Sequence, residues 1–271
     1  MLTSTREGPA IYYELLGNQD APVLALVRGL GRFALHWGAW LEQLAPHFRL
    51  LVLDNRGIGR SGAARTPFSV TAMSDDLARV LDHAQVARAH VFGMSLGGMV
   101  SLRFALDHGG RLDRLVLAAT TAGGASAVRP RFTPFLAMAR ARLFSPERAA
   151  EADAKMVLGA EFVRENPELV HAWTKLAREY PVPPRTLVFQ ALAALGHDVS
   201  RELAKIGAPT LIVSAEHDRI VPAENSRILG RGIRRSRLEW LPGDAHDLTT
   251  EHTEPLARLV LEFLAAPLGS A

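Results

Sequence analysis

The stretch Ala89-His-Val-Phe-Gly-Met-Ser-Leu-Gly-Gly-Met-Val-Ser101 decides the fold. Its first half is a short apolar run typical of a buried strand, and its second half has apolar residues at helical spacing. Between the two halves stands the pattern G-x-S-x-G, centred on Ser95. So abrupt a turn needs Gly93 and Gly97, because side chains two residues either side of the serine would collide as the backbone doubles back. Ser95 is therefore predicted to occupy the tip of a strained turn, at the positively polarised start of a helix.

Apolar runs and amphipathic stretches alternate on both sides of this turn. The strand-like runs are residues 23–27, 50–53, 89–92, 115–119, 209–213 and 238–241. The helix-like stretches are residues 73–81, 99–106, 223–229 and 255–265. Such alternation predicts a parallel sheet covered by helices on both faces.

Residues 122–206 interrupt the alternation. They are helical in pattern and are broken by prolines at positions 130, 134, 146, 167, 181, 183 and 184. We therefore expect one α/β domain in two parts, residues 1–121 and 207–271, with residues 122–206 inserted between them.

Composition narrows the class of protein. A chain of 271 residues with 48% hydrophobic content can bury a substantial core. No apolar run approaches the roughly 20 residues that span a bilayer, and no signal peptide opens the chain, so we expect a soluble, cytoplasmic protein without membrane association. The absence of cysteine excludes disulfides and thiolate catalysis. The net charge is only +3, the basic residues are spread along the chain, and no nucleic-acid-binding motif is found. These features argue against nucleic-acid binding.

A serine hydroxyl is a poor nucleophile at neutral pH and requires a histidine base that a carboxylate orients. Of ten histidines, His246 is favoured because it follows a strand in the glycine-containing loop Leu241-Pro-Gly-Asp-Ala-His246. Asp218 is the favoured carboxylate, since it lies just beyond another buried-strand candidate. Its rivals are Glu216, Asp244 and Asp247.

The chain order Ser, Asp, His, with the motifs around each, resembles the α/β-hydrolase superfamily, in particular its serine esterase and enol-lactonase branch. The resemblance covers nearly the whole chain apart from the insertion. It implies a mostly parallel, eight-stranded sheet flanked by helices, with residues 122–206 as a helical cap. It also implies catalysis without a cofactor or a metal.

Two more stretches carry the resemblance. Residues 52–61 resemble the family's D-x-R-G-x-G-x-S turn, which implies a structural role for Asp54, Arg56, Gly57, Gly59 and Ser61. The stretch Arg28-Gly-Leu-Gly31 occupies the place of the oxyanion loop, which implies that the backbone N–H groups of Leu30 and Leu96 bind the oxyanion.

Arg28 departs from the family pattern, which has histidine at this position. One interpretation is that its guanidinium braces the oxyanion loop; the other is that it recognises a substrate carboxylate or polar oxygen.

The other candidates for the substrate pocket are Met94, Phe132, Phe135 and Trp173. Aromatic and methionine residues at helical spacing are also common in plain cores.

These residues predict a hydrolase that cleaves a carboxylic ester or lactone of a small, largely apolar metabolite through an acyl-enzyme. An acyltransferase, thioesterase or perhydrolase on the same triad, or a receptor without turnover, remains an alternative.

Two further patterns have other interpretations. The arginines at positions 129, 131, 140, 142 and 148 form either a solvated surface or a binding surface for an acyl carrier protein or an anionic substrate. The G-x-G-x-x-G pattern at residues 57–62 is a weak dinucleotide-binding signal, because no helix opens there.

Overall fold

The computed structural model describes residues 1–3, 8–129 and 145–266. Seven strands form one sheet in the order β1-β3-β2-β4-β5-β6-β7. The strands are β1 (Tyr13–Gly17), β2 (Val23–Val27), β3 (Arg49–Leu53), β4 (Ala89–Met94), β5 (Leu112–Ala118), β6 (Thr210–Ala215) and β7 (Ser236–Leu241). Only β1 runs antiparallel to its neighbour. The predicted α/β-hydrolase architecture is confirmed.

The expected count of eight strands is wrong by one in the part of the chain that the structure describes. Beyond β1 the sheet continues only as an isolated bridge between Leu2 and Tyr12, which is too short to count as a strand. Sequence patterning also missed β1 itself. Three of its five residues are only half-buried, because an edge strand lacks the continuous apolar run of the central strands.

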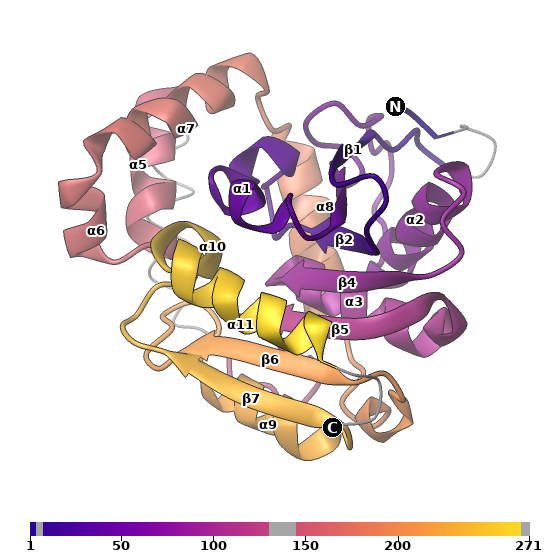
Figure 1. The fold of residues 1–271 in the computed structure, drawn as a ribbon. Helices are drawn as coiled ribbons and strands as arrows, with labels where there is room; N and C mark the ends of the chain where they lie inside the picture. Colours follow the sequence, from indigo (N-terminus) through magenta and orange to yellow (C-terminus); the bar gives the residue numbers. More distant parts are fainter. Residues whose placement is uncertain (4–7, 130–144, 267–271) are drawn as a thin grey trace.

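Helices cover both faces of the sheet (Figure 1). One group comprises α2 (Val70–His83), α3 (Leu96–Asp107) and α9 (Glu224–Gly232); the other comprises α1 (Trp40–Leu44), α10 (Leu248–Glu251) and α11 (Thr253–Ala265). Alternate strand residues feed two cores: Ala25 and Val27 face the first group of helices, and Leu24 and Leu26 face the second. None of the helices among the described residues is both long and apolar enough to cross a bilayer.

The inserted stretch contributes α5 (Pro146–Val157), α6 (Ala160–Glu165), α7 (Pro167–Glu179) and α8 (Pro184–Leu195). Three of these helices begin at prolines that the sequence marked as breaks, because proline suits the first turn of a helix. Helices α5 to α7 share a small core of their own. A bridge between Gly123 and Asp198 joins the stretch where it leaves the sheet to the stretch where it returns. The exact domain boundaries stay a prediction.

The strand order brings the functional candidates to one edge. In a parallel sheet the carboxyl ends of the strands lie on the same side, where ligands of open α/β sheets bind. Strand β2 leads into Arg28, β4 into Ser95, β6 toward Asp218 and β7 toward His246. Because β4 is the neighbour of β2, the loop after residue 27 lies beside the serine turn.

The buried His197 at the return from the insertion makes stability depend on pH. Burial, together with the positive charge of Arg103, lowers the pKa of the His197 side chain from 6.5 to about 4. Between these values the unfolded chain binds a proton that the folded chain does not, so stability falls as the pH is lowered through this window. The loss from this one residue reaches about 3 kcal/mol near the folded pKa.

We therefore expect His197→Leu to flatten the pH dependence of the unfolding free energy, measured by urea titration at a series of pH values across that window. The buried His36, whose pKa burial and Arg32 also lower, is present in both proteins, so the difference isolates His197. Equal pH dependence of the two proteins would contradict the assignment.

Candidate active site

Ser95 joins β4 to α3 in a strained conformation. Its φ of 57° and ψ of −121° lie in a region that residues with a side chain rarely adopt. Two hydrogen bonds hold the turn: the Ser95 N–H donates to the Ala118 carbonyl at 2.9 Å, and the Thr120 hydroxyl donates to the Ser95 carbonyl at 2.7 Å. The strain is thus balanced by bonds to the end of the neighbouring strand β5.

Close backbone packing explains the glycines around the serine. A Cβ atom on Gly97 would lie 2.0 Å from the Val27 carbonyl oxygen, and one on Gly93 would lie 2.2 Å from the Ser101 hydroxyl. The collision at Gly93 is the one that the turn pattern predicts, and the contact at Gly97 shows in addition that the start of α3 is pressed against the end of β2.

The structure brings the three predicted polar residues into one chain of hydrogen bonds. The Nε2 atom of His246 lies 2.9 Å from the Ser95 Oγ, and its Nδ1 atom lies 2.8 Å from the Asp218 Oδ2. The other oxygen of Asp218 accepts backbone N–H groups from Ile220 at 2.7 Å and Val221 at 3.0 Å. A carboxylate fixed in this way favours the tautomer with the proton on Nδ1, which leaves Nε2 free to accept the serine proton.

The rival carboxylates lie elsewhere. Glu216 is exposed, Asp244 pairs with Arg219 at 3.0 Å, and Asp247 pairs with Arg28 at 2.8 Å. Of these four acidic residues, only Asp218 bonds to the His246 ring.

The predicted oxyanion loop lies over the serine. A Cβ atom on Gly29 would be 3.1 Å from the Ser95 Cβ. Within the described residues, the backbone N–H groups of Leu30 and Leu96 have no hydrogen-bond acceptor. Leu96 is the first residue of α3, where a helix has no internal acceptor for the N–H. Two backbone N–H groups next to the serine turn in the chain or in space thus have no acceptor in the part of the chain that the structure describes, as binding of an oxyanion would require.

Arg28 is fully buried and faces the histidine loop. Its guanidinium donates to the Asp247 carboxylate at 2.8 Å, the Thr249 hydroxyl at 2.9 Å and the His36 carbonyl at 2.8 Å. Burial alone would raise the pKa of Asp247, but the Arg28 charge and its hydrogen bonds lower it to about 2. Because its donors are occupied by these bonds, the bracing interpretation of Arg28 is favoured over recognition of a substrate. The loop that its side chain braces is the one that carries His246, not the oxyanion loop.

The inserted helices also contact this loop. The carbonyl oxygen of Val157, the last residue of α5, accepts the backbone N–H groups of His246 and Asp247, both at 2.8 Å. Farther along, the Gln190 side chain of α8 accepts the Gly31 N–H at 2.8 Å. None of these contacts was predicted from the sequence, although an arginine directly after a buried strand and an aspartate next to the predicted base were a usable signal.

The remaining pocket candidates are only partly placed. Met94 is 4% exposed and packs in the core on the face of the sheet that α1, α10 and α11 cover. Its sulfur lies 3.6 Å from the Arg28 Nη1 atom. Trp173 is buried in the core of the inserted helices, with the Arg32 guanidinium 3.9 Å from its ring centroid. Phe132 and Phe135 lie outside the described residues, as do the arginines at positions 131, 140 and 142.

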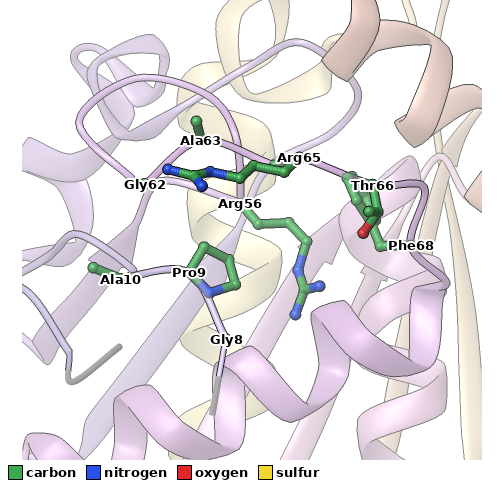
Figure 2. Close-up of a pocket in the computed structure, with 10 residues that line it drawn as sticks. Gly8, Pro9, Ala10, Arg56, Gly62, Ala63, Arg65, Thr66 and Phe68 are labelled. Atoms are coloured by element: carbon green, nitrogen blue, oxygen red, sulfur yellow. The ribbon is translucent and has the colours of Figure 1, made fainter. Parts of the chain in front are cut away.

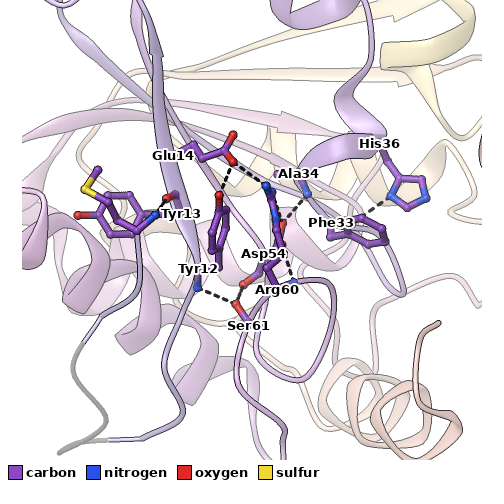
Figure 3. Close-up of polar contacts among 10 residues, drawn as sticks. Tyr12, Tyr13, Glu14, Phe33, Ala34, His36, Asp54, Arg60 and Ser61 are labelled. Carbon is purple, nitrogen blue, oxygen red and sulfur yellow. Dashed lines mark hydrogen bonds and ion pairs between the residues drawn. The ribbon is translucent and has the colours of Figure 1, made fainter. Parts of the chain in front are cut away.

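The D-x-R-G-x-G-x-S turn forms a brace for the segment that follows the oxyanion loop (Figure 3). The Asp54 carboxylate accepts the backbone N–H groups of Ala34 at 2.8 Å and Arg60 at 2.9 Å. The Ser61 hydroxyl donates to the Asp54 carbonyl and accepts the Tyr12 N–H at 2.8 Å. This network ties β1, β3 and the segment after the oxyanion loop together, in line with the structural role that the resemblance implies.

Residues 57–62 form turns, and the next helix starts only at Val70, so the helix that a dinucleotide-binding site needs does not open at these glycines. A surface hollow of about 460 Å³ lies beside this turn, lined by residues that include Pro9, Arg65 and Phe68 (Figure 2). Its lining contains none of the three hydrogen-bonded residues around Ser95.

Comparisons with known proteins agree with this architecture. Residues 22–253 match a family described as "alpha/beta hydrolase fold". A curated relative, the "Putative carbamate hydrolase RutD" of Caulobacter sp. (strain K31), is 31% identical over 98% of both chains. A thermophilic esterase from Thermogutta terrifontis has 26% identity and a TM-score of 0.81, covering 97% of each chain. The enol-lactonase from Burkholderia xenovorans LB400 shares the fold at 24% identity and a TM-score of 0.83, covering 97% of this chain and 100% of that one.

The close approach at Gly97 generates a prediction. Gly97→Ala would push a methyl group into the Val27 carbonyl, which the β2 ladder holds in place, so we expect a loss of more than about 3 kcal/mol in unfolding free energy. The matched control is Gly110→Ala, where a Cβ would meet nothing within 4 Å; it should change stability by less than about 0.5 kcal/mol. Chemical denaturation measures both, and similar values for the two variants would contradict the packing argument.

Proposed function

The chain belongs to the α/β-hydrolase family, and from this premise we propose that it is a serine hydrolase that cleaves a carboxylic ester or lactone of a small, largely apolar molecule. The observation that carries the proposal is the unbroken chain of hydrogen bonds from Ser95 through His246 to Asp218. In this proposal Ser95 is the nucleophile, His246 the general base and Asp218 the carboxylate that orients the base.

In the first half of the reaction, His246 Nε2 takes the proton from Ser95 as the serine oxygen attacks the substrate carbonyl carbon. The carbonyl oxygen becomes an oxyanion and accepts the N–H groups of Leu30 and Leu96; each such donor contributes on the order of 3 kcal/mol. As the carbon–oxygen bond to the alcohol breaks, His246 returns its proton to the leaving alkoxide. The product of this half is an acyl-Ser95 ester.

In the second half, a water molecule replaces the serine as nucleophile. His246 takes one proton from the water as the oxygen attacks the acyl carbon, and the same two N–H groups hold the second oxyanion. The bond to Ser95 then breaks and the serine recovers a proton from His246, which releases the acid. For a lactone the alcohol and the acid leave as one molecule.

Residues 122–206 act in this proposal as a helical cap over the pocket. The contacts from Val157 to the histidine loop and from Gln190 to Gly31 support this role, because they join the inserted helices to both sides of the serine. A cap of this kind excludes water and restricts the size of the substrate.

A carbamate is the second candidate substrate, favoured by the name of the 31% identical relative. The same attack on a carbamate carbonyl gives a carbamoyl-serine, whose nitrogen lone pair makes the carbonyl carbon less reactive toward water. p-Nitrophenyl acetate and p-nitrophenyl N-methylcarbamate share one leaving group and therefore separate the two classes. Steady turnover of the acetate with slow turnover of the carbamate supports the ester proposal, whereas the reverse order supports the carbamate.

We expect Ser95→Ala to lower the rate of ester hydrolysis by on the order of 10³-fold or more, because no other group would take the place of the nucleophile. A fluorophosphonate probe should add one adduct to the wild-type protein and none to this variant in intact-protein mass spectrometry. Ser74→Ala is the matched control, since Ser74 is also buried but lies on α2 away from the site. Labelling that persists in Ser95→Ala would place the nucleophile elsewhere.

We also expect His246→Ala and Asp218→Asn each to slow the same hydrolysis strongly, with Asp218→Asn on the order of 10⁴-fold because the amide permits the wrong tautomer of the base. Both variants should keep the far-ultraviolet circular dichroism of the wild type. If Glu216→Gln were inactive while Asp218→Asn kept most of its activity, the assignment of the carboxylate would be wrong.

A further inference from the structure

Arg28 is connected to each proposed catalytic element, to one through the chain and to two through its guanidinium. Arg28 lies two residues before Leu30 in the oxyanion loop. Its Nη1 atom is 3.6 Å from the sulfur of Met94, the residue before the nucleophile. Its Nη2 atom donates at 2.8 Å to Asp247, the residue after His246. The guanidinium thus contacts a neighbour of the nucleophile and a neighbour of the base, and its backbone leads into the oxyanion loop.

This guanidinium group is buried, and both Nη atoms of Arg28 donate hydrogen bonds, while the Nε atom has no acceptor among the described residues. The side chains of Arg28 and Asp247 are 0% and 2% exposed. Thr249 donates to Asp247 at 2.7 Å and accepts from Arg28 at 2.9 Å, and the Trp37 ring centroid lies 4.5 Å from the guanidinium carbon. A buried pair of opposite charges has a narrow energy minimum, because any displacement leaves a charge without water and without a partner.

Stability alone does not account for such a pair. A buried ion pair is often no more stabilising than a well-packed apolar pair of the same volume. What it adds is a fixed geometry between two segments that are 219 residues apart in the chain. Catalysis by a serine, a base and an oxyanion donor depends on such geometry, and a misplacement of about 1 Å can lower the rate on the order of 10²-fold.

We propose that the Arg28–Asp247 ion pair is a positioning device that sets the oxyanion loop and the His246 loop in register around Ser95. The proposal rests on the function proposed above. It assigns Arg28 and Asp247 as positioning residues that act through Leu30 and His246 and do not touch the substrate.

Removing one partner leaves a buried unpaired charge, which can unfold the protein, so the decisive variant removes both charges. We expect Arg28→Met/Asp247→Leu to stay folded, because it replaces the pair by apolar side chains. Its kcat for p-nitrophenyl acetate should fall on the order of 10²-fold, while its KM changes by less than about threefold. Arg28→Lys keeps the charge and loses the bidentate donor, so its kcat should lie between that of the double variant and that of the wild type.

A second measurement reads the position of the base without any turnover. The His246 Nδ1 proton, held by Asp218, should give a low-field signal in the proton NMR spectrum, identified by its loss in His246→Ala. We expect the signal to shift or broaden in the double variant. Because the spectrum needs no substrate, it separates a failure of this proposal from a failure of the proposed function, which Ser95→Ala tests on its own.

The matched control is Arg114→Met. Arg114 is also a buried arginine, on strand β5, but it donates to the Phe263 carbonyl near the end of α11 and not to the catalytic candidates. This control should lose stability while kcat and the His246 proton signal stay at wild-type values. If the double variant behaves in the same way, with kcat and the signal unchanged, the pair is structural and the positioning proposal is overturned.

Discussion

The structure depends on one close approach, between the carbonyl oxygen of Val27 and the backbone at Gly97. Because no side chain fits at that point, the start of α3 can press against the end of β2, and the chain must reverse within a few residues at Ser95. The positive φ that results would destabilise an isolated turn, yet two hydrogen bonds to the end of β5 hold it here. The same contact sets the loop after β2 beside the serine, so one packing constraint brings the half-buried hydroxyl and the proposed oxyanion loop together.

Around this point, charged groups hold loops that the sheet alone would leave free. Asp54 fixes the segment after the oxyanion loop through the Ala34 N–H, and Arg28 connects the strand before that loop to Asp247. Neither side chain is exposed. In our account such buried polar groups contribute geometry more than stability, since their desolvation offsets much of their attraction. Substitutions at these positions should therefore affect rate and stability in different proportions.

Much of this arrangement could be predicted from the sequence, because its signals are local. The buried central strands appear as continuous apolar runs, and the turn pattern places Ser95, with Asp218 and His246 each following a strand. The edge strand β1 could not be predicted, since its half-buried residues lack such a run. The ion pair between Arg28 and Asp247 was missed for another reason: it joins residues 219 positions apart, and only the strand order shows that their loops meet.

We propose above all that the substrate is held for a time as an ester of Ser95. The most direct test mixes the wild-type protein with p-nitrophenyl acetate, quenches it in acid within the first turnover and maps the acetyl group by peptide mass spectrometry. The account predicts that the acetyl group is on the peptide containing Ser95 and disappears as free acetate accumulates. Hydrolysis that proceeds with no acetylated Ser95 at any time, in a sample whose quench preserves acyl-serine esters, would contradict it.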